Sequence, residues 1–394
     1  MLNGYAKGTA MNSSCLGNES GNVRQPGRAV IEELLAAAGV AVNGGRPFDI
    51  QIKHPLFFRR VLQQGSLGLG ESYMDGWWEC ERLDVFFQRV MRAGLEYKLP
   101  RRWRDILYVL AARLVNYQSV RRARRVGEEH YDLGNDLFTA MLDPHMQYSC
   151  GYWKNAATLE EAQEAKLRLV CDKLRLEPGM HLLDIGCGWG GMAAYAARHY
   201  GVRVTGITIS EQQRRLAEAR CEDLDVEIQL RDYRHLALQA DRIVSVGMFE
   251  HVGPRNYRAY FETAARNLKP DGLFLLHTIG AKVTDLRIDP WIEKYIFPNG
   301  CLPSTSHIAR ASAPYWVMED WHNFGADYDL TLMAWLQRFQ QAWPQLAANY
   351  SSRFYRMFTY YLNACAGAFR ARDLQLWQVL FSREGIEGGL RVAR

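Results

Sequence analysis

A glycine-rich turn is the first part of the sequence whose residue types and spacing could do chemistry. Residues 181–210 read HLLDIGCGWGGMAAYAARHYGVRVTGITIS, in which an apolar segment closes on Asp184 and a helical stretch follows the turn. Glycines let the backbone adopt positive φ and come close to a ligand. The turn therefore predicts a site at which backbone N–H groups meet a small ligand. Its glycines are Gly186, Gly188, Gly190 and Gly191.

Two details of the same stretch narrow the identity of that ligand. A G-x-G pattern alone is weak, because sites for NAD, FAD and S-adenosylmethionine all use one. Here the spacing is G-x-G-x-G-G rather than G-x-G-x-x-G, and the second apolar segment ends in GITIS, with no acid before Glu211. A nicotinamide site needs an acid there, about 20 residues after the turn, to bind the ribose. We therefore expect S-adenosylmethionine and keep a nicotinamide-dependent oxidoreductase as the alternative.

Two neighbouring segments allow both a structural and a cofactor-binding interpretation. Ser210 to Gln213 read S-E-Q-Q, which fits a helix capping box, and capping can coexist with a cofactor contact at one helix start. Asp232 and Tyr233 follow the third apolar segment, where an acid could reach an adenine amino group and a ring could stack. An ordinary turn explains their spacing equally well.

The elements that must position these residues alternate between strand and helix after residue 128 or so. Helical stretches separate most of the apolar, β-rich segments, which is typical of an α/β protein with a doubly wound sheet and a largely parallel core. We expect a Rossmann-like, seven-stranded sheet with the glycine turn at its switch point. The expected strands are 181–185, 202–207, 226–230, 242–247, 272–279, 316–321 and 374–382.

The first third of the chain has a different composition. Residues 1–26 are rich in Gly, Asn and Ser and are expected to be a disordered tail. Residues 27–120 predict a smaller, mainly helical domain, and 121–394 the catalytic domain. Between Lys98 and Arg125, nine basic residues stand against one acid, with apolar residues among them. This stretch fits a helix on an anionic membrane surface and equally a solvated helix that packs on its own domain.

Composition also limits the cellular context. The eight cysteines are scattered without a C-x-x-C pair, so we expect reduced thiols and no metal site. The sequence lacks an apolar run of about 18 residues and the basic-then-apolar order of a signal peptide. We therefore expect a cytoplasmic protein that can touch a membrane surface and has no nucleic-acid partner.

Longer motifs point to one family. The chain resembles the cyclopropane-fatty-acyl-phospholipid synthases, S-adenosylmethionine-dependent enzymes related to the mycolic acid cyclopropane synthases. The resemblance covers nearly everything after the tail. It rests on GSLGLGESYMDGWWEC (65–80), EHYDLGNDLF (129–138), MQYSCGYW (146–153), LLDIGCGWGG (182–191), GITIS (206–210), SVGMFEHVG (245–253), FLLHTIG (274–280), YIFPNGCLPS (295–304), EDWHNFGADY (319–328) and YYLNACAGAFR (360–370).

The resemblance implies an activity. Such enzymes transfer a methylene group from S-adenosylmethionine to the cis double bond of an unsaturated acyl chain in membrane phospholipids. A carbocation forms on the chain, a bound bicarbonate ion removes a proton, and the cyclopropane ring closes. The resemblance also implies a homodimer that associates peripherally with the inner face of the membrane.

The resemblance also implies which residues act. Glu250, His277, Cys150, Tyr328 and the backbone of Ile279 match the bicarbonate pocket of the family. Cys365 has been linked to catalysis in such enzymes, but alkene methylation needs no enzyme nucleophile, so we interpret it as a residue of the pocket wall. Cation–π attraction could stabilise the carbocation; the candidate rings are Tyr148, Tyr295, Phe297 and Tyr328.

The S-adenosylmethionine site is carried over from the same motifs. One departure from the family pattern is Gly151, where an alanine is usual, and it is expected to loosen the loop. Rival functions are a sister lipid methyltransferase with a methyl-branched, hydroxylated or methylene product, and a non-catalytic lipid-binding protein. The expected cofactor residues are Tyr148, Ser149, Asp184, Ile185, Gly186, Cys187, Gly188, Trp189, Gly190, Gly191, Thr208, Ser210, Glu211, Gln212, Gln213, Asp232, Tyr233 and Arg234.

Overall fold

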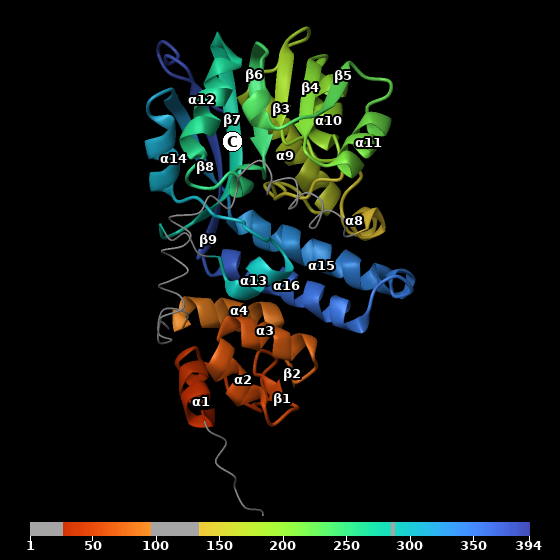
Figure 1. The fold of residues 1–394 in the computed structure, drawn as a ribbon, viewed down its shortest axis with the longest axis vertical. Helices are drawn as coiled ribbons and strands as arrows, with labels where there is room; N and C mark the ends of the chain where they lie inside the picture. The colour runs from red at the N-terminus through yellow and green to blue at the C-terminus, as the bar shows by residue number, and fades with distance from the viewer. Residues whose placement is uncertain (1–26, 96–133, 285–287) are drawn as a thin grey trace, which may run out of the picture.

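The computed structural model describes residues 27–95, 134–284 and 288–394. The N-terminal tail and the basic stretch at 98–125 lie outside these residues, as does the expected domain boundary at 120. Figure 1 shows three tiers: a sheet with its helices, a pair of long helices beneath it, and a smaller group of helices at the N-terminal end.

A seven-stranded sheet forms the first tier, in the order β5-β4-β3-β6-β7-β9-β8. The expected α/β class and doubly wound sheet are confirmed. Strands β3 to β7 pair in parallel, while β9 runs antiparallel between β7 and β8. The strands are β3 (His181–Ile185), β4 (Arg203–Thr208), β5 (Val226–Leu230), β6 (Ala240–Val246), β7 (Leu268–Ala281), β8 (Val317–Asn323) and β9 (Leu374–Ser382).

Helices cover both faces of this sheet, because successive side chains of each buried strand point to opposite faces. Leu182 packs in a cluster with α9 and α10, whereas its neighbour Leu183 packs with α12 and α14. In Figure 1, α10 and α11 lie on the side of β4 and β5. The helices are α8 (Asn135–Met141), α9 (Leu159–Lys173), α10 (Gly191–Tyr200), α11 (Glu211–Arg220), α12 (Tyr257–Arg266) and α14 (Thr305–Ser312).

Two long helices form the middle tier. They are α15 (Ala326–Leu346) and α16 (Ser352–Arg370), and they connect β8 to β9 along the chain. The short helix α13 (Pro290–Tyr295) lies beside them (Figure 1). Leu376 of β9 and the buried apolar residues of α16 belong to one apolar cluster, so the sheet packs on these helices.

The N-terminal tier packs directly on α16. An added Cβ at Gly367 would lie 2.5 Å from the Cβ of Phe87, so the two helices are in close contact. The rings of Phe87 and Tyr360 meet edge to face at 4.9 Å. The elements of this tier are α1 (Arg28–Ala37), β1 (Gln51–Ile52), α2 (Phe57–Gln64), α3 (Ser66–Met74), β2 (Trp78–Glu79) and α4 (Leu83–Arg92).

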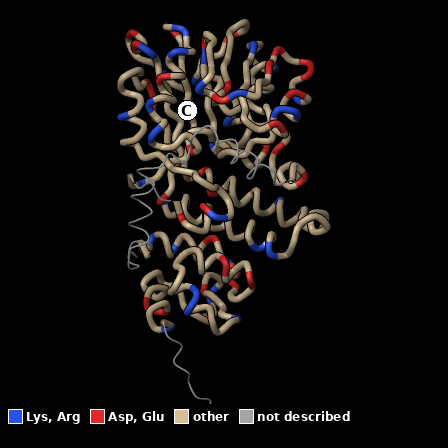
Figure 2. Tube along the Cα trace, in the orientation of Figure 1, with Lys and Arg blue, Asp and Glu red and all other residues tan. Residues whose placement is uncertain are grey.

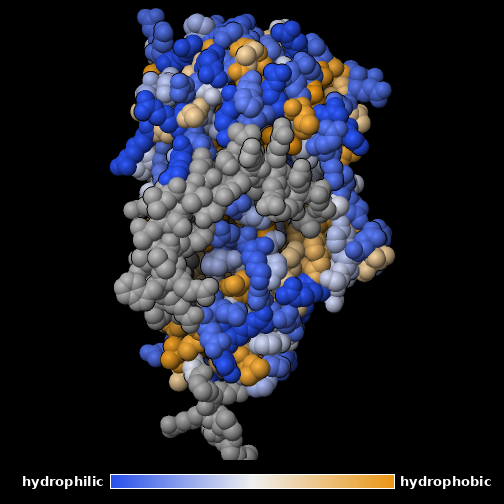
Figure 3. All heavy atoms as spheres, viewed as in Figure 1, coloured by the Kyte–Doolittle hydropathy of each residue, from blue (hydrophilic) through white to orange (hydrophobic). Residues whose placement is uncertain are grey.

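The surface carries both signs of charge. Figure 2 shows Lys and Arg interspersed with Asp and Glu over the described parts of the chain. On the face in Figure 3, hydrophilic atoms dominate the upper tier and apolar atoms form small separate groups. Among the described helices, none is both long enough and apolar enough to cross a bilayer.

Candidate active site

A cavity opens at the carboxyl ends of β3, β4, β5 and β6, where a doubly wound sheet binds its ligands. Most of the expected cofactor residues line it, and these are Tyr148, Ser149, Asp184, Gly186, Cys187, Gly188, Trp189, Thr208, Gln213, Asp232, Tyr233 and Arg234. The others lie outside the lining, and these are Ile185, Gly190, Gly191, Ser210, Glu211 and Gln212.

The glycine turn divides into a part that faces the cavity and a part that packs. Gly186 and Gly188 have φ of 88° and 55°, and a Cβ at Gly188 would meet no atom within 4 Å. Gly190 has φ of 78°, and its added Cβ would lie 2.9 Å from the Cβ of Ala217. An added Cβ at Gly191 would lie 1.9 Å from a backbone oxygen. The last two glycines therefore serve close packing of α10 rather than the lining.

The start of α11 is mainly structural. The Oγ of Ser210 accepts a hydrogen bond from the N–H of Gln213 at 3.3 Å, which caps the helix. The Gln213 side chain does not complete a capping box but accepts from the Thr208 hydroxyl at 2.9 Å, at the cavity wall. Glu211 forms ion pairs with Arg214 and Arg215, whose hydrogen bonds lower its pKa to about 2.

This geometry argues against the nicotinamide alternative. Strand β4 ends at Thr208, and the nearest following acid, Glu211, is engaged by arginines outside the cavity lining. A ribose at this strand end would therefore find no free carboxylate on it.

Asp232 keeps both of its interpretations. It caps the short helix η1 (Tyr233–His235) by accepting from the N–H of Arg234 at 3.0 Å, and it also lines the cavity. Burial raises the pKa of its carboxyl, but hydrogen bonds from Arg234 outweigh burial and lower it overall. The side chain is therefore an anion at neutral pH.

Asp184 tests whether the cavity fits S-adenosylmethionine. It ends β3, is 1% exposed, and its Oδ2 has no hydrogen-bond partner among the described residues. Burial raises the pKa of this carboxyl to about 7. An orphaned buried acceptor is costly unless a ligand donates to it. A polar, hydroxyl- and amine-bearing ligand such as S-adenosylmethionine supplies such donors, so the residues present fit this group.

Sequence motifs missed the buried support beneath this cavity. Lys166 of α9 is 0% exposed, and its Nζ donates to the Oγ of Ser149 at 2.9 Å and to the Oε1 of Gln147. Gln163 donates to the backbone oxygen of Ser149 at 2.8 Å. These contacts hold the 147–149 segment in place, and a helix interior offers no local motif that would reveal them.

A second group of expected residues lies next to the cavity. Glu250 belongs to the short helix η2 (Phe249–His251), between the lining residues Met248 and His251. Its Oε1 accepts the backbone N–H of Ile279 at 2.7 Å, while its Oε2 is buried without a partner among the described residues. Burial raises the pKa of this carboxyl to about 7. The backbone N–H of Ile279, which was expected to meet the bicarbonate ion, thus donates to Glu250 instead.

His277 lies on β7 and is neutral. It is 1% exposed, and burial lowers its pKa well below the usual range, with Lys166 and Lys173 adding electrostatically. Its Nδ1 lies 3.3 Å from the Nε2 of Gln378, and its own Nε2 has no partner among the described residues. A neutral imidazole with one unpaired nitrogen can donate to or accept from a ligand there.

Cys150 and Tyr328 complete this group. Cys150 is 0% exposed, and burial raises its thiol pKa well above the usual range, so it stays protonated. Tyr328 is buried on α15, and burial raises its pKa well above the usual range, with Cys150 and Glu250 adding electrostatically. Gly151 does not loosen this segment: an added Cβ would lie 2.9 Å from the Cβ of Ala162. Glycine here allows tight packing on α9.

Aromatic side chains contact one another near this group and on the long helices. The hydroxyls of Tyr148 and Tyr361 lie 2.9 Å apart, and the ring of Phe297 lies 5.9 Å from that of Tyr361. The rings of Tyr328 and Phe369 lie 4.5 Å apart. Aromatic rings attract a cation that lies over their faces.

Two expected residues have other surroundings. Tyr295 donates to the Oε1 of Glu71 at 2.9 Å, and Lys294 pairs with the same oxygen at 2.6 Å. Tyr295 therefore joins α13 to the N-terminal tier. Cys365 lies on α16 near Tyr361, and burial raises its thiol pKa to about 12. A thiol of this kind is a poor nucleophile.

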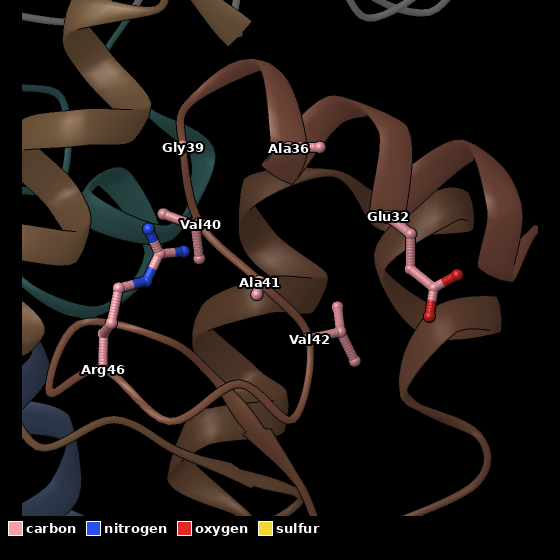
Figure 4. Close-up of a pocket in the computed structure, with 7 residues that line it drawn as sticks. All are labelled: Glu32, Ala36, Gly39, Val40, Ala41, Val42 and Arg46. Carbon is pink, nitrogen blue, oxygen red and sulfur yellow. The ribbon is translucent and has the colours of Figure 1, made fainter.

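A second hollow lies in the N-terminal tier (Figure 4). It is lined by Glu32 and Ala36 of α1 and by the following loop, which carries Arg46. Arg46 is already paired with Asp49 at 2.8 Å. None of the expected site residues lines this hollow.

Comparison with known proteins agrees with the geometry. A family model described as mycolic acid cyclopropane synthetase matches residues 118–379. A cyclopropane-fatty-acyl-phospholipid synthase of Escherichia coli (strain K12) is 68% identical over 365 residues, which are 93% of this chain and 95% of that protein.

Solved structures agree as well. The cyclopropane synthase MmaA2 from Mycobacterium tuberculosis is 33% identical with a TM-score of 0.63, over 66% of this chain and 98% of that chain. The mycolic acid cyclopropane synthase CmaA1, complexed with SAH and CTAB, is 34% identical with a TM-score of 0.62, also over 66% and 98%. The chain therefore belongs to the cyclopropane synthase family and is an S-adenosylmethionine-dependent methyltransferase.

Proposed function

We propose that this chain transfers a methylene group from S-adenosylmethionine to the cis double bond of unsaturated acyl chains in membrane phospholipids and so forms a cyclopropane ring. The observation that carries the proposal is the pair of buried, unpaired atoms, Glu250 Oε2 and His277 Nε2, beside the cofactor cavity. The name of the Escherichia coli relative supports the substrate class.

Residues of the glycine turn and of the 148–149 segment would hold the cofactor. When bound, S-adenosylmethionine supplies an electrophilic methyl group. The chain's own task is to align a weakly nucleophilic alkene with that methyl group, which is a matter of proximity. The rings of Tyr148, Tyr361 and Phe297 would position the acyl chain and exclude water. Water in this space would capture the cation as an alcohol.

The second group of residues would hold a bicarbonate ion. When bound, bicarbonate supplies the base that takes a proton from the transferred methyl carbon. His277 and Tyr328 would donate hydrogen bonds to the ion, and the Cys150 thiol is protonated and compatible with an anion. Glu250, with a pKa of about 7, could share a proton with the ion or accept its hydroxyl. The Ile279 N–H would act through Glu250, to which it donates.

The proposal extends to the cellular setting. The acyl substrate lies in a bilayer, so the protein would act in the cytoplasm, docked on the inner face of the membrane. The basic stretch at 98–125 and the N-terminal tier would supply the docking surface. A homodimer would let one protomer stay docked while the other reacts. Residues 27–120 and 121–394 are the proposed docking and catalytic domains.

The test is a direct assay with lipid vesicles. The protein is incubated with labelled S-adenosylmethionine and unilamellar vesicles of a monounsaturated phospholipid. We expect acyl chains heavier by one CH₂ that contain a cyclopropane ring, by mass spectrometry and NMR of the lipids. A methyl-branched, methylene or hydroxylated product would overturn the assignment.

Bicarbonate has its own test. In buffer freed of carbon dioxide, turnover is expected to fall and to recover when bicarbonate is added, while binding of S-adenosylhomocysteine stays the same. Turnover that is indifferent to bicarbonate would contradict its role and leave the reaction itself in place.

A further inference from the structure

Three polar side chains form a row across the sheet behind the proposed anion site. Gln378 of β9 is the register partner of His277 on β7 and of His322 on β8. Directly opposed residues of adjacent strands project to the same face of a sheet. The carboxamide of Gln378 therefore lies between two imidazole side chains.

The contact between Gln378 and His277 defines the protonation of the imidazole. Gln378 is 1% exposed, and its Nε2 lies 3.3 Å from the Nδ1 of His277. In this orientation of the carboxamide its nitrogen donates, so Nδ1 accepts with its lone pair, and the carboxamide Oε1 has no partner among the described residues. A neutral imidazole carries one hydrogen, which is then on Nε2. That nitrogen is the atom without a partner among the described residues.

The far end of the row lies beside a buried lysine that pairs with an aspartate. The Nδ1 of His322 lies 3.0 Å from the Nζ of Lys173, whose side chain is 0% exposed. The carboxylate of Asp320 is 3.5 Å from the same Nζ. Lys166, Lys173 and His322 all disfavour a charged His277. Together with burial, these groups keep the pKa of His277 well below its usual range, so the resting imidazole is neutral.

We propose that Gln378 is a positioning residue for the proposed reaction, because its amide fixes His277 as the Nε2–H tautomer and aims that N–H at the oxyanion site. The other tautomer would turn the Nε2 lone pair toward a bound anion and repel it. Gln378 thus acts through His277 and does not line the cofactor cavity. The expected effect on kcat rests on the proposed function, whereas the tautomer of His277 can be measured without it.

The first experiment measures the tautomer in the resting protein. The wild-type chain is labelled with ¹⁵N-histidine, and the His277 signals are assigned by their loss in His277→Asn. We expect a neutral ring with its hydrogen on Nε2 from pH 6 to pH 8. A hydrogen on Nδ1, or an imidazolium in this range, would overturn the inference. The tautomer is read from the wild-type chain, and His277→Asn serves only to assign the signals.

The second experiment changes the donor. Gln378→Met keeps the volume but removes the amide, and Gln378→Glu places an acceptor opposite Nδ1. We expect kcat to fall about 10-fold for Met and about 100-fold for Glu, as for other outer-sphere partners of a functional histidine. We expect the ring in Gln378→Glu to carry a hydrogen on Nδ1. The dissociation constant for S-adenosylhomocysteine should change less than about twofold, because the cavity is not touched.

The matched control is Gln375→Glu on the same strand. Gln375 accepts from Asn323 at 2.7 Å and from Trp377 at 3.2 Å, and a carboxylate can accept both bonds. Its kcat and the His277 tautomer should remain those of the wild type. Wild-type kcat in both Gln378 variants would refute the positioning role. A wild-type chain that makes no cyclopropane would refute the proposed function, while the tautomer would still decide the inference.

Discussion

Glu250→Gln is expected to stabilise the protein while it slows turnover by orders of magnitude. The carboxyl is buried, one oxygen accepts the Ile279 N–H at 2.7 Å, and the other has no partner among the described residues. A glutamine of the same shape can keep the first bond through its carbonyl oxygen. It removes the charge that burial makes costly.

The size of the gain follows from the pKa. Burial raises the Glu250 pKa from 4.5 to about 7, a difference of about 2.5 pH units. At about 1.4 kcal/mol per unit, ionising this carboxyl costs the folded state up to about 3 kcal/mol. The folded pKa is the higher one, so the favourable contribution is full below pH 4.5 and is lost as pH rises to 7. Glutamine does not ionise, so the free energy of unfolding of the variant does not fall in this way as pH rises.

The assay is urea unfolding of both proteins at pH 5 and pH 8. We expect the free energies of unfolding to agree within about 1 kcal/mol at pH 5, and the variant to be about 3 kcal/mol more stable at pH 8. The exposed Glu387→Gln is the control and should match the wild type at both values. A Glu250→Gln variant that is less stable at pH 8 would refute the reasoning, because the carboxylate would then have a stabilising partner.

Turnover gives the second readout of the same variant. Loss of a group that accepts or shares a proton costs about 10²- to 10⁴-fold in rate. We expect this loss in kcat, with vesicle binding and S-adenosylhomocysteine binding unchanged. Retained turnover would remove Glu250 from the proposed chemistry.

Two more variants test the turn and the cysteine. Gly190→Ala should lower the free energy of unfolding by about 1–3 kcal/mol, because φ is positive and the new Cβ would crowd Ala217. The control Gly45→Ala places its Cβ in open space and should leave this free energy unchanged. Equal free energies of unfolding for the two variants would contradict this prediction. Cys365→Ala should keep kcat within about threefold, because a thiol with a pKa of about 12 is not a thiolate at neutral pH. A fall in kcat of about 100-fold with an unchanged free energy of unfolding would indicate a direct role for this cysteine.

Local patterns were enough to predict the strands and much of the lining of the cavity at their carboxyl ends. The seven expected strands are present within a few residues of their expected bounds. Of the turn, Asp184, Gly186, Cys187 and Gly188 line the cavity, because the chain conformation of a strand end and a glycine turn is a local property. The motifs also selected Glu250 and His277, which the fold brings together beside the cavity, after β6 and on β7.

The same patterns failed where a neighbour decides the role. Gly190 and Glu211 share motifs with cofactor residues, yet one packs on Ala217 and the other pairs with arginines on its own helix. Nothing in the motif states which atoms will face the cavity. The direction of β9 was also beyond the pattern, because a strand buried on both faces has the same apolar run in either direction.

What the sequence alone determined is the set of elements, the turn that meets a small ligand and the residues with the chemistry to act. Only the tertiary structure decided how those residues are protonated and held. Lys166 lies on a helix without a motif and donates to Ser149. Gln378 lies on a strand without a motif and contacts His277, which is about 100 residues away in the sequence. Burial and the nearest donor set the charge and tautomer of a side chain, and both depend on which elements pack together.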